Sequence, residues 1–352
     1  MFLDIQSLIG VLVKDFWRYQ TAILAKDNSY LSICNRYEKL QVSPDHEGFL
    51  CDWLWTSDLH APKILPFLGK QLFRKALTNH PITLSNITPE KSNSPQVSFI
   101  IGHRGKPRLP HLLKTLESIA GQSNIQLECI VVEQDNLSLL PEYLPSWVEY
   151  IHTPLPAVDM PYCRSWAFNV GARKAKSDIL IFHDNDFLIS QDYAKEVLRR
   201  IEQGYEVVNI KRFLFYLSQV GTQQFFDNRG SLINKPLENI VQNLEAGGSI
   251  AIARNKYWQI GGFDETFIGW GGEDNEFWER AQTLKVWNYG YLPMVHLWHP
   301  SQTEKEKSRN NAPAVILYRE LSKLPVVKRI ENLQSCHFGN IDTPVIYNKE
   351  RS

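Results

Sequence analysis

The stretch that decides the fold is Ile179-Leu-Ile-Phe-His-Asp-Asn-Asp186, an apolar run that ends in two carboxylates one residue apart. A short continuous apolar run is typical of a strand that is buried on both faces of a parallel sheet. Two carboxylates after such a strand can hold a divalent cation against a diphosphate, because hard cations prefer oxygen ligands. We therefore expect an α/β protein with a metal-dependent site at the carboxyl edge of its sheet.

Two further strands of the same kind precede this stretch. Val97 to Ile101 and Leu127 to Val132 are apolar runs, and apolar residues recur at helical spacing from Leu112 to Ile119 between them. This pattern predicts a βαβ unit. Ligands of such sheets bind beyond the carboxyl ends of the strands. Arg104 follows the first strand and Asp135 follows the second, so we expect both side chains beside the acidic pair.

The overall composition is that of an ordinary globular protein with one large domain or two, since 43% of the 352 residues are hydrophobic and 22% are charged. Lysine plus arginine and aspartate plus glutamate both number 38, so the formal net charge is zero. A chain without a single-sign electrostatic field has no general means of attracting nucleic acid. We therefore expect no nucleic-acid partner.

The cysteines and the N-terminus favour a reducing compartment. The five cysteines are widely spread and show no Cys-x-x-Cys spacing for a zinc or redox site. The longest apolar stretch near the N-terminus, Leu8 to Val13, is far shorter than the roughly 20 residues of a membrane-spanning helix. No secretion-signal pattern is visible. We expect a cytoplasmic protein without a transmembrane segment, and peripheral contact with the inner face of the membrane stays open.

Residues 1–90 differ in pattern from the rest of the chain. Apolar residues recur there at three- and four-residue intervals, as at Leu8, Leu12 and Phe16, which predicts helices. These helices either cap the main domain or bind an acceptor, and the pattern favours the cap. The polar stretch from Thr88 to Pro95 is typical of a linker, so we place a domain boundary there.

An ordered series of motifs follows the acidic pair. Gly247-Gly248 begins the run that ends at Arg254, and Gly269-Trp-Gly-Gly-Glu-Asp274 comes after it. Together with the acidic pair, this series resembles the GT-A glycosyltransferases: the first half is similar to family-2 enzymes and the second half to the β-1,4-galactosyltransferases. The resemblance implies a GT-A fold, which is Rossmann-like with a mostly parallel central sheet and flanking helices, here preceded by a helical N-terminal region.

The expected division of the chain follows from this resemblance, which covers roughly residues 96–302. We expect a helical N-terminal region at 1–90, a GT-A domain at 96–302 with a nucleotide-binding half at 96–190 and an acceptor half at 240–302, and a C-terminal extension at 303–352.

The metal site is implied by the same resemblance. Asp186 would coordinate Mn²⁺ (or Mg²⁺) on the donor diphosphate, and Asp184 would contact the ribose or reach the metal through water. The preferred third ligand is His299, and His296 stands three residues before it, so the two histidines could share or exchange roles. Imidazole suits manganese better than magnesium. One alternative stays open, namely that the acidic pair caps the helix expected to start near Tyr193.

The donor site is expected along the strand ends. The resemblance places there the segment Arg164-x-x-x-x-Asn169-x-Gly171 and the double glycine, which allows close backbone approach to the donor sugar. Galactosyltransferases carry aromatic residues just before the double glycine, whereas this chain has Glu245-Ala246, so the transferred hexose stays open. The expected donor-binding residues are Arg104, Asp135, Arg164, Asn169, Gly171, Asp184, Gly247 and Gly248.

The acceptor side is expected at the second motif. Asp274 is the predicted catalytic base, because an attacking hydroxyl must lose its proton to a carboxylate within hydrogen-bond reach. Glu273 and the ring of Trp270 are predicted to bind the acceptor. Both acids also suit the N-terminus of a helix, and the two roles are compatible. The glycines around Trp270 imply a mobile loop that closes over the donor.

We therefore expect a metal-dependent inverting glycosyltransferase that moves galactose or N-acetylgalactosamine from a UDP-sugar to a saccharide or glycolipid acceptor, in the synthesis of surface polysaccharide or other glycans. Polypeptide N-acetylgalactosaminyltransferases carry asparagine where this chain has Asp274, and this difference favours inversion. Two alternatives stay open: a retaining enzyme of that kind, and an inactive carbohydrate-binding protein on a GT-A frame.

Overall fold

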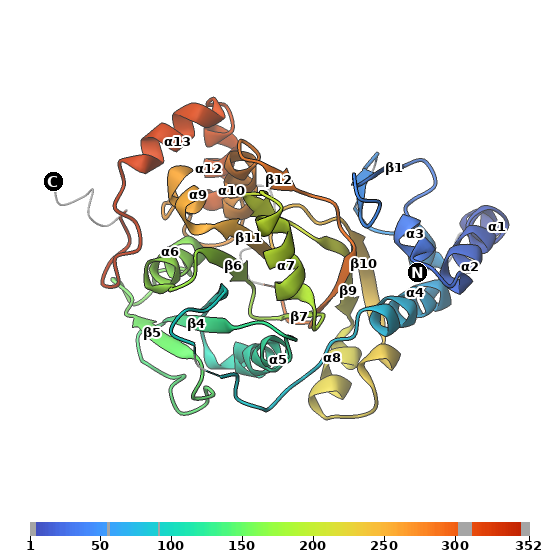
Figure 1. Cartoon of the computed structure of the whole chain (residues 1–352), viewed down its shortest axis with the longest axis horizontal. Coiled ribbons are helices and arrows are strands. Elements are labelled where there is room, and N and C mark those ends of the chain that lie inside the picture. The colour runs from blue at the N-terminus through green and yellow to red at the C-terminus, as the bar shows by residue number, and fades with distance from the viewer. Residues whose placement is uncertain (1–4, 55–56, 91, 302–311, 346–352) are drawn as a thin grey trace.

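The computed structural model describes residues 5–54, 57–90, 92–301 and 312–345. Its centre is a seven-stranded sheet, whose strands are β3 (Val97–His103), β4 (Leu127–Gln134), β5 (Glu149–Thr153), β6 (Ile179–His183), β8 (Val207–Val208), β11 (Ser249–Ala253) and β12 (Val286–Trp287). The order across the sheet is β12-β8-β11-β6-β3-β4-β5, and β11, β6, β4 and β5 can be followed in this order in Figure 1. β11 runs antiparallel to both neighbours, and the other pairs in this sheet are parallel. The predicted α/β class with a mostly parallel sheet is confirmed.

Helices cover both faces of this sheet. The first face carries α5 (Leu109–Ala120) and α7 (Tyr193–Glu202), and the second carries α6 (Arg164–Lys174), α9 (Arg254–Gln259) and α10 (Glu273–Ala281). Along β3, Phe99 and Ile101 point into the first core, whereas Ile100 points into the second. Because successive side chains of a strand alternate between faces, burial of both faces explains the continuous apolar runs of the sequence.

A second sheet adjoins the first one. Its strands are β7 (Phe187–Ile189), β9 (Lys211–Leu217), β10 (Leu237–Gln242) and β13 (Leu292–His296), in the order β10-β9-β13-β7. The chain passes from β6 to β7 through Asp184–Asp186, so the acidic pair lies where the two sheets meet. β7 separates this pair from α7, whose N-terminal flanking residue is Asp192. The alternative that the acidic pair caps this helix is therefore wrong.

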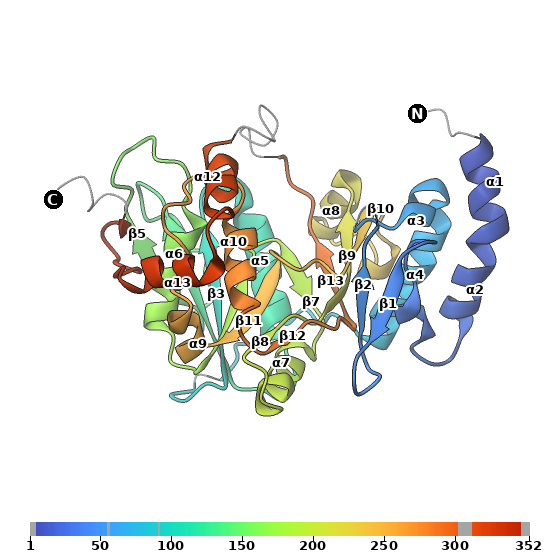
Figure 2. The same cartoon turned by 90° about the horizontal axis from the view of Figure 1, so that it is seen from above.

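The N-terminal region is mainly helical, as predicted, and packs on the second sheet. It contains α1 (Ile5–Lys14), α2 (Phe16–Leu24), α3 (His60–Ile64), α4 (Pro66–Asn79) and an additional hairpin of β1 (Lys39–Val42) and β2 (Phe49–Asp52). Helix α4 packs against β10 and β13, and the ring centroids of Phe73 and Phe215 lie 4.8 Å apart. Figure 2 shows α1 and α2 at the end of the molecule farthest from β5. The helices thus cap the second sheet.

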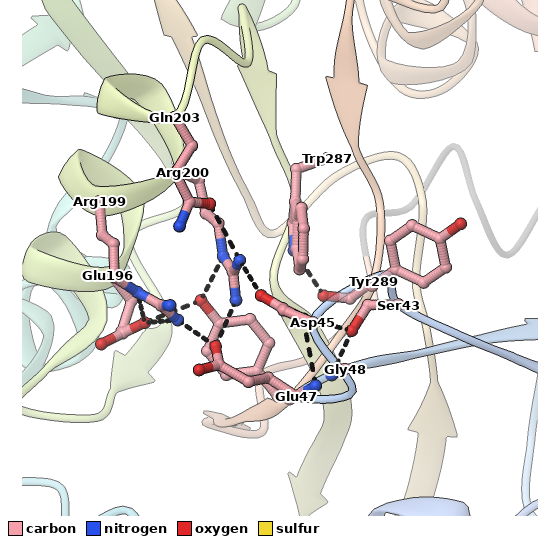
Figure 3. A network of polar contacts seen from close by, with 11 residues as sticks. Ser43, Asp45, Glu47, Gly48, Glu196, Arg199, Arg200, Gln203, Trp287 and Tyr289 are labelled. Carbon is pink, nitrogen blue, oxygen red and sulfur yellow. Dashed lines mark hydrogen bonds and ion pairs between the residues drawn. The ribbon is translucent and has the colours of Figure 1, made fainter.

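The hairpin turn is fixed to the large sheet by a buried arginine (Figure 3). Arg200 of α7 has no exposed surface and pairs with Asp45 and with Glu47, the latter at 2.6 Å. Its guanidinium lies 3.5 Å from the ring centroid of Trp287 in β12, a favourable cation–π geometry. Arg199 also donates to Glu47. A buried charge with this many partners holds the hairpin in one position.

The C-terminal segment is part of the same fold. Helices α12 (Pro313–Leu321) and α13 (Val326–Gln334) come after β13, and both pack against α10. Helix α8 (Gln219–Phe226) lies between β9 and β10 in the sequence. The N–H groups of Gly339 and Val345 donate to the buried carboxylate of Glu265. Within the described ranges, no helix combines the length and the apolar character that crossing a membrane requires.

Candidate active site

The acidic pair and the double glycine meet at the carboxyl edge of the large sheet. Strand β11 pairs with β6 so that Ser249 lies opposite His183. The N–H of Asp184 donates to the carbonyl of Gly248 at 2.9 Å, and the N–H of Gly248 donates back to Oδ2 of Asp184 at 3.1 Å. Gly247 and Gly248 have φ angles of +80° and +73°, which glycine adopts at little cost. The glycines thus hold the first carboxylate by its backbone and its side chain.

The second carboxylate belongs to a group of three potential metal ligands. Strand β13 runs antiparallel to β7, which places His296 opposite Phe187 and therefore next to Asp186. Nε2 of His296 lies 3.9 Å and Nε2 of His299 lies 3.4 Å from Oδ2 of Asp186. One ligand atom from each residue falls within 4.8 Å of the others. Asp184 lies outside this group.

Two atoms of this group have unused hydrogen-bonding capacity. Oδ1 of Asp186 and Nδ1 of His296 are buried, and the residues that the structure describes give neither atom a hydrogen-bond partner. Burial of a polar atom without a partner is costly, and a bound ion on Oδ1 would remove that cost for the carboxylate. The donor set of one carboxylate and two imidazoles fits manganese or zinc. These three residues could hold a divalent cation.

The electrostatics favour the forms of these residues that bind metals. Burial lowers the pKa of His296 to about 4, so its imidazole is neutral near pH 7 and can donate a lone pair. Burial opposes ionisation of Asp186, but in the acid range where this carboxyl titrates the positive charges of protonated His296 and of Arg108 outweigh burial and lower its pKa. Arg108 also donates to Asp186 directly. The carboxylate is therefore ionised over the physiological range.

A single arginine gathers the remaining carboxylates. Arg164 opens α6 and donates to Oδ1 of Asp184 and to Oδ1 of Asp274, each at 2.5 Å, and to Oε1 of Glu273 at 3.4 Å. Burial opposes the charge of Arg164, but the three carboxylates raise its pKa well above its ordinary value. The arginine cluster, as we name Arg164 with these three acids, joins the acidic pair to the acceptor motif.

Two acids of the arginine cluster bind protons more tightly than usual. Burial raises the pKa of Asp184 to about 6, although Arg164 opposes this rise. Burial, together with the nearby charge of Asp274, raises the pKa of Glu273 to about 7. One arginine cannot neutralise three carboxylates, so part of the negative charge is left for a cation or a proton to neutralise.

Lys211 is a further charged residue of this edge that the sequence reading missed. Its Nζ donates to the carbonyls of Gly247 at 2.9 Å and Ser249 at 2.5 Å. Burial lowers the pKa of this lysine to about 7, although the charges of Asp274 and Asp184 oppose the change. The lysine fixes the backbone of the double glycine. The available signal was the charged pair Lys211-Arg212 at the start of a strand, β9, that is apolar or aromatic from there on.

Two other predicted donor-binding residues lie at the rim of this edge. Arg104 donates to the carbonyl of Met160 at 2.7 Å. The carboxylate of Asp135 accepts a hydrogen bond from the N–H of Asn136, and the backbone carbonyl of Asp135 is hydrogen-bonded to Nε2 of His152. Both side chains are half-buried at the carboxyl ends of β3 and β4, so a ligand could reach them.

The remaining two predicted donor-binding residues lie in the interior. Asn169 is fully buried, and its side-chain amide donates hydrogen bonds to the carbonyl of Phe263 and to Oε1 of Glu265. A Cβ on Gly171 would come within 2.3 Å of Ile100, so this glycine lets α6 pack closely on β3. The structure therefore does not bring Asn169 or Gly171 to the strand ends, because the face of α6 that carries them is turned to the core.

The loop that carries Trp270 is packed against the C-terminal segment. Trp270 is half-buried, and the N–H of Gly269 donates to the carbonyl of Tyr162 at 2.9 Å. A Cβ on Gly272 would lie 2.7 Å from Cβ of Tyr318 in α12. Any opening or closing of this loop must therefore involve α12, and the loop motion itself stays a prediction.

Two missed residues support the metal ligands. Arg108 ends the short 3₁₀ turn η2 (Lys106–Arg108) and reaches Asp186 across the edge. His111 lies in α5, and its Nε2 is 2.9 Å from the carbonyl of Trp298, next to His299. Neither residue stands in a motif. Their proximity to the site comes from the packing of α5 against β7, which a single sequence does not reveal.

Comparison with known proteins places these features in context. Residues 98–290 match the model of the family described as "Glycosyltransferase like family 2". The chain is 25% identical over 201 residues to β-1,4-galactosyltransferase 5 of Sus scrofa, which is 56% of this chain and 39% of that protein. It is 27% identical over 137 residues to N-acetylgalactosaminyltransferase 6 of Drosophila melanogaster, which is 34% of this chain and 20% of that protein.

The match extends over less than half of the length of these two relatives. Among solved structures, the chain is similar to GalNAc-T7 in complex with UDP, GalNAc and Mn²⁺, with a TM-score of 0.44 and 15% identity over 73% of this chain and 58% of that one.

Proposed function

Because this chain belongs to the glycosyltransferase-like family 2, we propose that it is a metal-dependent inverting glycosyltransferase that uses a UDP-sugar. The transferred sugar is galactose or N-acetylgalactosamine, and the acceptor is a hydroxyl of a saccharide or of a glycolipid headgroup. The observation that carries the proposal is a juxtaposition. A group that could hold a metal, at Asp186, and a carboxylate that can act as a base, at Asp274, lie at one sheet edge and are linked through Asp184 and Arg164.

The metal end would bind the nucleoside diphosphate. Asp186, His296 and His299 would hold Mn²⁺ (or Mg²⁺), and a bound ion would supply positive charge that stabilises the departing diphosphate. Arg108 is the nearest protein cation to this group, since it donates to Asp186. A diphosphate oxygen would give Arg108 a second anionic partner. Arg104 and Asp135, at the rim, would contact the nucleoside.

The acceptor end would carry out the proton transfer. The acceptor oxygen forms a bond to the anomeric carbon while the bond from that carbon to the diphosphate oxygen breaks, and UDP leaves with the electron pair. The acceptor proton moves to the carboxylate of Asp274, whose side chain is 30% exposed and is therefore accessible to a substrate. Arg164 donates to this carboxylate and orients it toward the acceptor hydroxyl.

The retaining reaction is the second candidate, because an N-acetylgalactosaminyltransferase is among the relatives. The local geometry favours inversion: Asp274 and Asp184 bind different terminal nitrogens of Arg164, so a carboxylate outside the acidic pair is available as the base for a single displacement. A retaining enzyme would give the same anomer in the product as in the UDP-α-sugar. An inactive saccharide-binding protein would release no UDP at all.

The test is a panel of UDP-sugars with Mn²⁺, scored for UDP release with and without simple glycosides as acceptors. Proton NMR of the product would report the anomer. We expect a β product from UDP-galactose or UDP-N-acetylgalactosamine, and loss of turnover in Asp186→Asn. The matched control is Asp178→Asn, which removes a carboxylate whose side chain is 90% exposed. An α product would contradict inversion, and full activity of Asp186→Asn would contradict the metal assignment.

We also propose that the protein works in the cytoplasm, in peripheral contact with the inner face of a membrane. Helices α1 and α2 expose Ile5, Ile9, Val13 and Trp17, each by more than half of its surface. Lys14 and Arg18 lie beside them, and the one acid between them, Asp15, is buried and paired to Arg18 and Arg36. An apolar helix face with basic flanks is suited to an anionic lipid surface.

Vesicle sedimentation tests this contact. The full chain should sediment with vesicles of anionic lipid more than with neutral ones, and the double variant Ile9→Ser/Trp17→Ser should lose most of this binding. Val220→Ser changes an equally exposed apolar residue on another helix, α8, and serves as the control. Equal sedimentation of all three proteins would rule out the α1–α2 face as the contact.

A further inference from the structure

A cavity of about 350 Å³ lies next to the predicted base and is walled partly by the N-terminal region. Its lining includes Trp53, Ser57, Glu245, Ala246, Asn275 and Trp278. Asn275 directly follows Asp274, and Ala246 directly precedes Gly247, where a Cβ would lie 3.0 Å from Oδ2 of Asp274. The volume is within the range of small-ligand sites, which begins at roughly 300 Å³. The cavity therefore continues the site beyond its catalytic carboxylate.

The N-terminal wall of the cavity is fixed at both ends. The N–H of Phe49 donates to the carbonyl of Gly290, and the amide of Asn243 donates to the carbonyl of Phe49. Eight residues later, the carbonyl of Ser57 accepts from the N–H of Gln242 at 2.9 Å. Trp53 lies between these anchors.

Buried arginines strengthen this attachment. Arg212 is fully buried and donates to the carbonyls of Leu31 and Ile33 and to the side chain of Asn243. Arg200 of α7 pairs with Asp45 of the hairpin turn (Figure 3), so buried arginines hold the N-terminal region at two separate places. Buried charged hydrogen bonds thus hold the N-terminal region beside the cavity, and the backbone bonds of Phe49 and Ser57 lie on either side of Trp53.

Two indole N–H groups of the cavity lack partners. Nε1 of Trp53 and Nε1 of Trp278 are both buried, and within the described part of the chain neither has a hydrogen-bond acceptor. Trp278 is 5% exposed, on the helix that begins at Glu273. Buried indole N–H groups usually find an acceptor. Both rings line the cavity, so a ligand with an apolar face and oxygen acceptors suits these two tryptophans.

We propose that this cavity is a subsite for a pyranose ring of the acceptor, so that the N-terminal region takes part in acceptor recognition. The inference rests on the proposed glycosyltransferase activity and deepens it. A pyranose has the required chemistry: its C–H face packs on aromatic rings, and its hydroxyl and ring oxygens accept from indole N–H groups. The carboxylate of Glu245 and the amide of Asn275 can bind the remaining hydroxyls.

The position of the cavity argues for the acceptor. Asp184 lies two residues before Asp186 of the metal group and is joined through Arg164 to Asp274, and the next residue, Asn275, lines the cavity. The donor diphosphate belongs at the metal group. A sugar that presents its hydroxyl to Asp274 from the cavity is the attacking partner.

The test uses the full chain labelled with ¹⁵N-tryptophan, whose indole N–H signals are assigned with Trp53→Phe, Trp278→Phe and Trp17→Phe. Methyl β-glycosides of glucose, galactose, N-acetylglucosamine and N-acetylgalactosamine are titrated in turn. We expect at least one glycoside to shift the Trp53 and Trp278 signals together and to leave that of Trp17, an exposed residue of α2, in place. If none of the four glycosides shifts either signal, the subsite is disproved.

Kinetics separate this inference from the proposed function. In Trp53→Phe and Trp278→Phe, which keep an aromatic wall but lose one N–H each, the KM for the acceptor should rise about fivefold to tenfold. Hydrolysis of the UDP-sugar without acceptor should stay unchanged, as should both values in Trp17→Phe. Equal loss of hydrolysis and transfer would contradict the acceptor role. Signal shifts without any UDP release would keep the saccharide site and contradict the transfer reaction.

Discussion

The metal group (Asp186, His296 and His299) and the arginine cluster each contain one carboxylate of the acidic pair. The two groups are built in different ways. Asp186 and His296 are placed by strand pairing, since β13 lies beside β7 in fixed register. The acids of the cluster come from a strand end and from the start of α10, and Arg164 connects them. Atoms of the metal group are left without partners, whereas each acid of the cluster has its arginine.

This difference separates two ways of preparing a site for its substrate. The metal group has buried polar atoms without partners, so binding of a cation there adds interactions and breaks few existing ones. Each acid of the arginine cluster already has a cationic partner, so a substrate hydroxyl that approaches Asp274 competes with Arg164 for this carboxylate. We therefore expect substitutions in the metal group to lower catalytic activity. Substitutions in the arginine cluster should also change the stability of the fold and the pH dependence of that stability.

The largest effect should follow Asp186→Ala. A metal ion contributes several kcal/mol to stabilisation of a leaving group, so loss of the ligand that lies between the two histidines should reduce kcat about 1000-fold. Calorimetric titration with Mn²⁺ would measure the loss of binding directly. His337→Ala, at an exposed position far from the site, should bind Mn²⁺ like the wild type. Normal Mn²⁺ binding by Asp186→Ala would show that the ion sits elsewhere.

Arg164→Gln should have the next largest effect, and on stability as well as on activity. The change leaves Asp184, Glu273 and Asp274 close together without their shared cation. Removal of one partner from a largely buried ion pair costs about 3 kcal/mol, and urea denaturation would measure the loss. Arg254→Gln breaks an exposed pair with Asp178 and should cost less than about 1 kcal/mol. Similar losses in the two variants would mean that the arginine cluster contributes no special stability.

The pH dependence of stability tests the same cluster through a smaller expected change in unfolding free energy. In the folded protein burial raises the pKa of Glu273 from 4.5 to about 7. The folded state therefore holds this proton more tightly than the unfolded state does, so the stabilisation is complete below pH 4.5 and is lost as the pH rises toward 7. Between pH 5 and pH 7, Glu273→Gln should gain about 2 kcal/mol of unfolding free energy relative to wild type.

Urea denaturation at pH 5, 6 and 7 would measure this gain. Glu320→Gln, which removes an exposed carboxylate of α12, should run parallel to the wild type across this range. If Glu273→Gln also runs parallel to the wild type, the proton on Glu273 has no part in stability, and the burial of this acid in the cluster does not perturb it.

Much of the fold was predictable because its signals are local. The apolar runs at Val97, Leu127 and Ile179 became β3, β4 and β6, and the helix expected at Glu273 became α10. Strand ends in a parallel sheet share an edge, so the approximate location of the acidic pair also followed. The β1–β2 hairpin was missed although Ser43-Pro-Asp-His-Glu-Gly48 is a turn sequence between two short runs, because helical spacing dominates its neighbours.

The rest of the site depends on contacts between distant segments. Arg108, His111 and Lys211 reach the edge only through helix packing and strand pairing, which no spacing in one sequence encodes. The same holds for Trp53, which stands more than 180 residues from Glu245 in the chain. Conversely, Asn169 and Gly171 matched a motif, yet the packing of α6 on β3 turns them inward. A motif identifies residue types, and the packing decides which way they face.

The smallest effect is expected from alanine substitutions of two glycines, Gly247 and Gly230. The pair distinguishes crowding of Asp274 by a new Cβ from backbone strain alone. Gly247 and Gly230 both have left-handed φ angles, +80° and +74°. Alanine at either position should therefore cost about 1 kcal/mol of stability. A Cβ at Gly247 would also lie 3.0 Å from Oδ2 of Asp274, whereas a Cβ at Gly230 would meet no atom within 4 Å.

Because a small misplacement of a catalytic group is costly, Gly247→Ala should lose roughly tenfold in kcat and Gly230→Ala should keep wild-type activity. Both variants should unfold at similar urea concentrations, so the activity ratio isolates the contact with Asp274. Equal activities would show that the carboxylate can move aside freely. In that case Arg164 would not hold Asp274 in a fixed position, and the contrast between a cluster of paired acids and a metal group with unpartnered atoms would fail at its acceptor end.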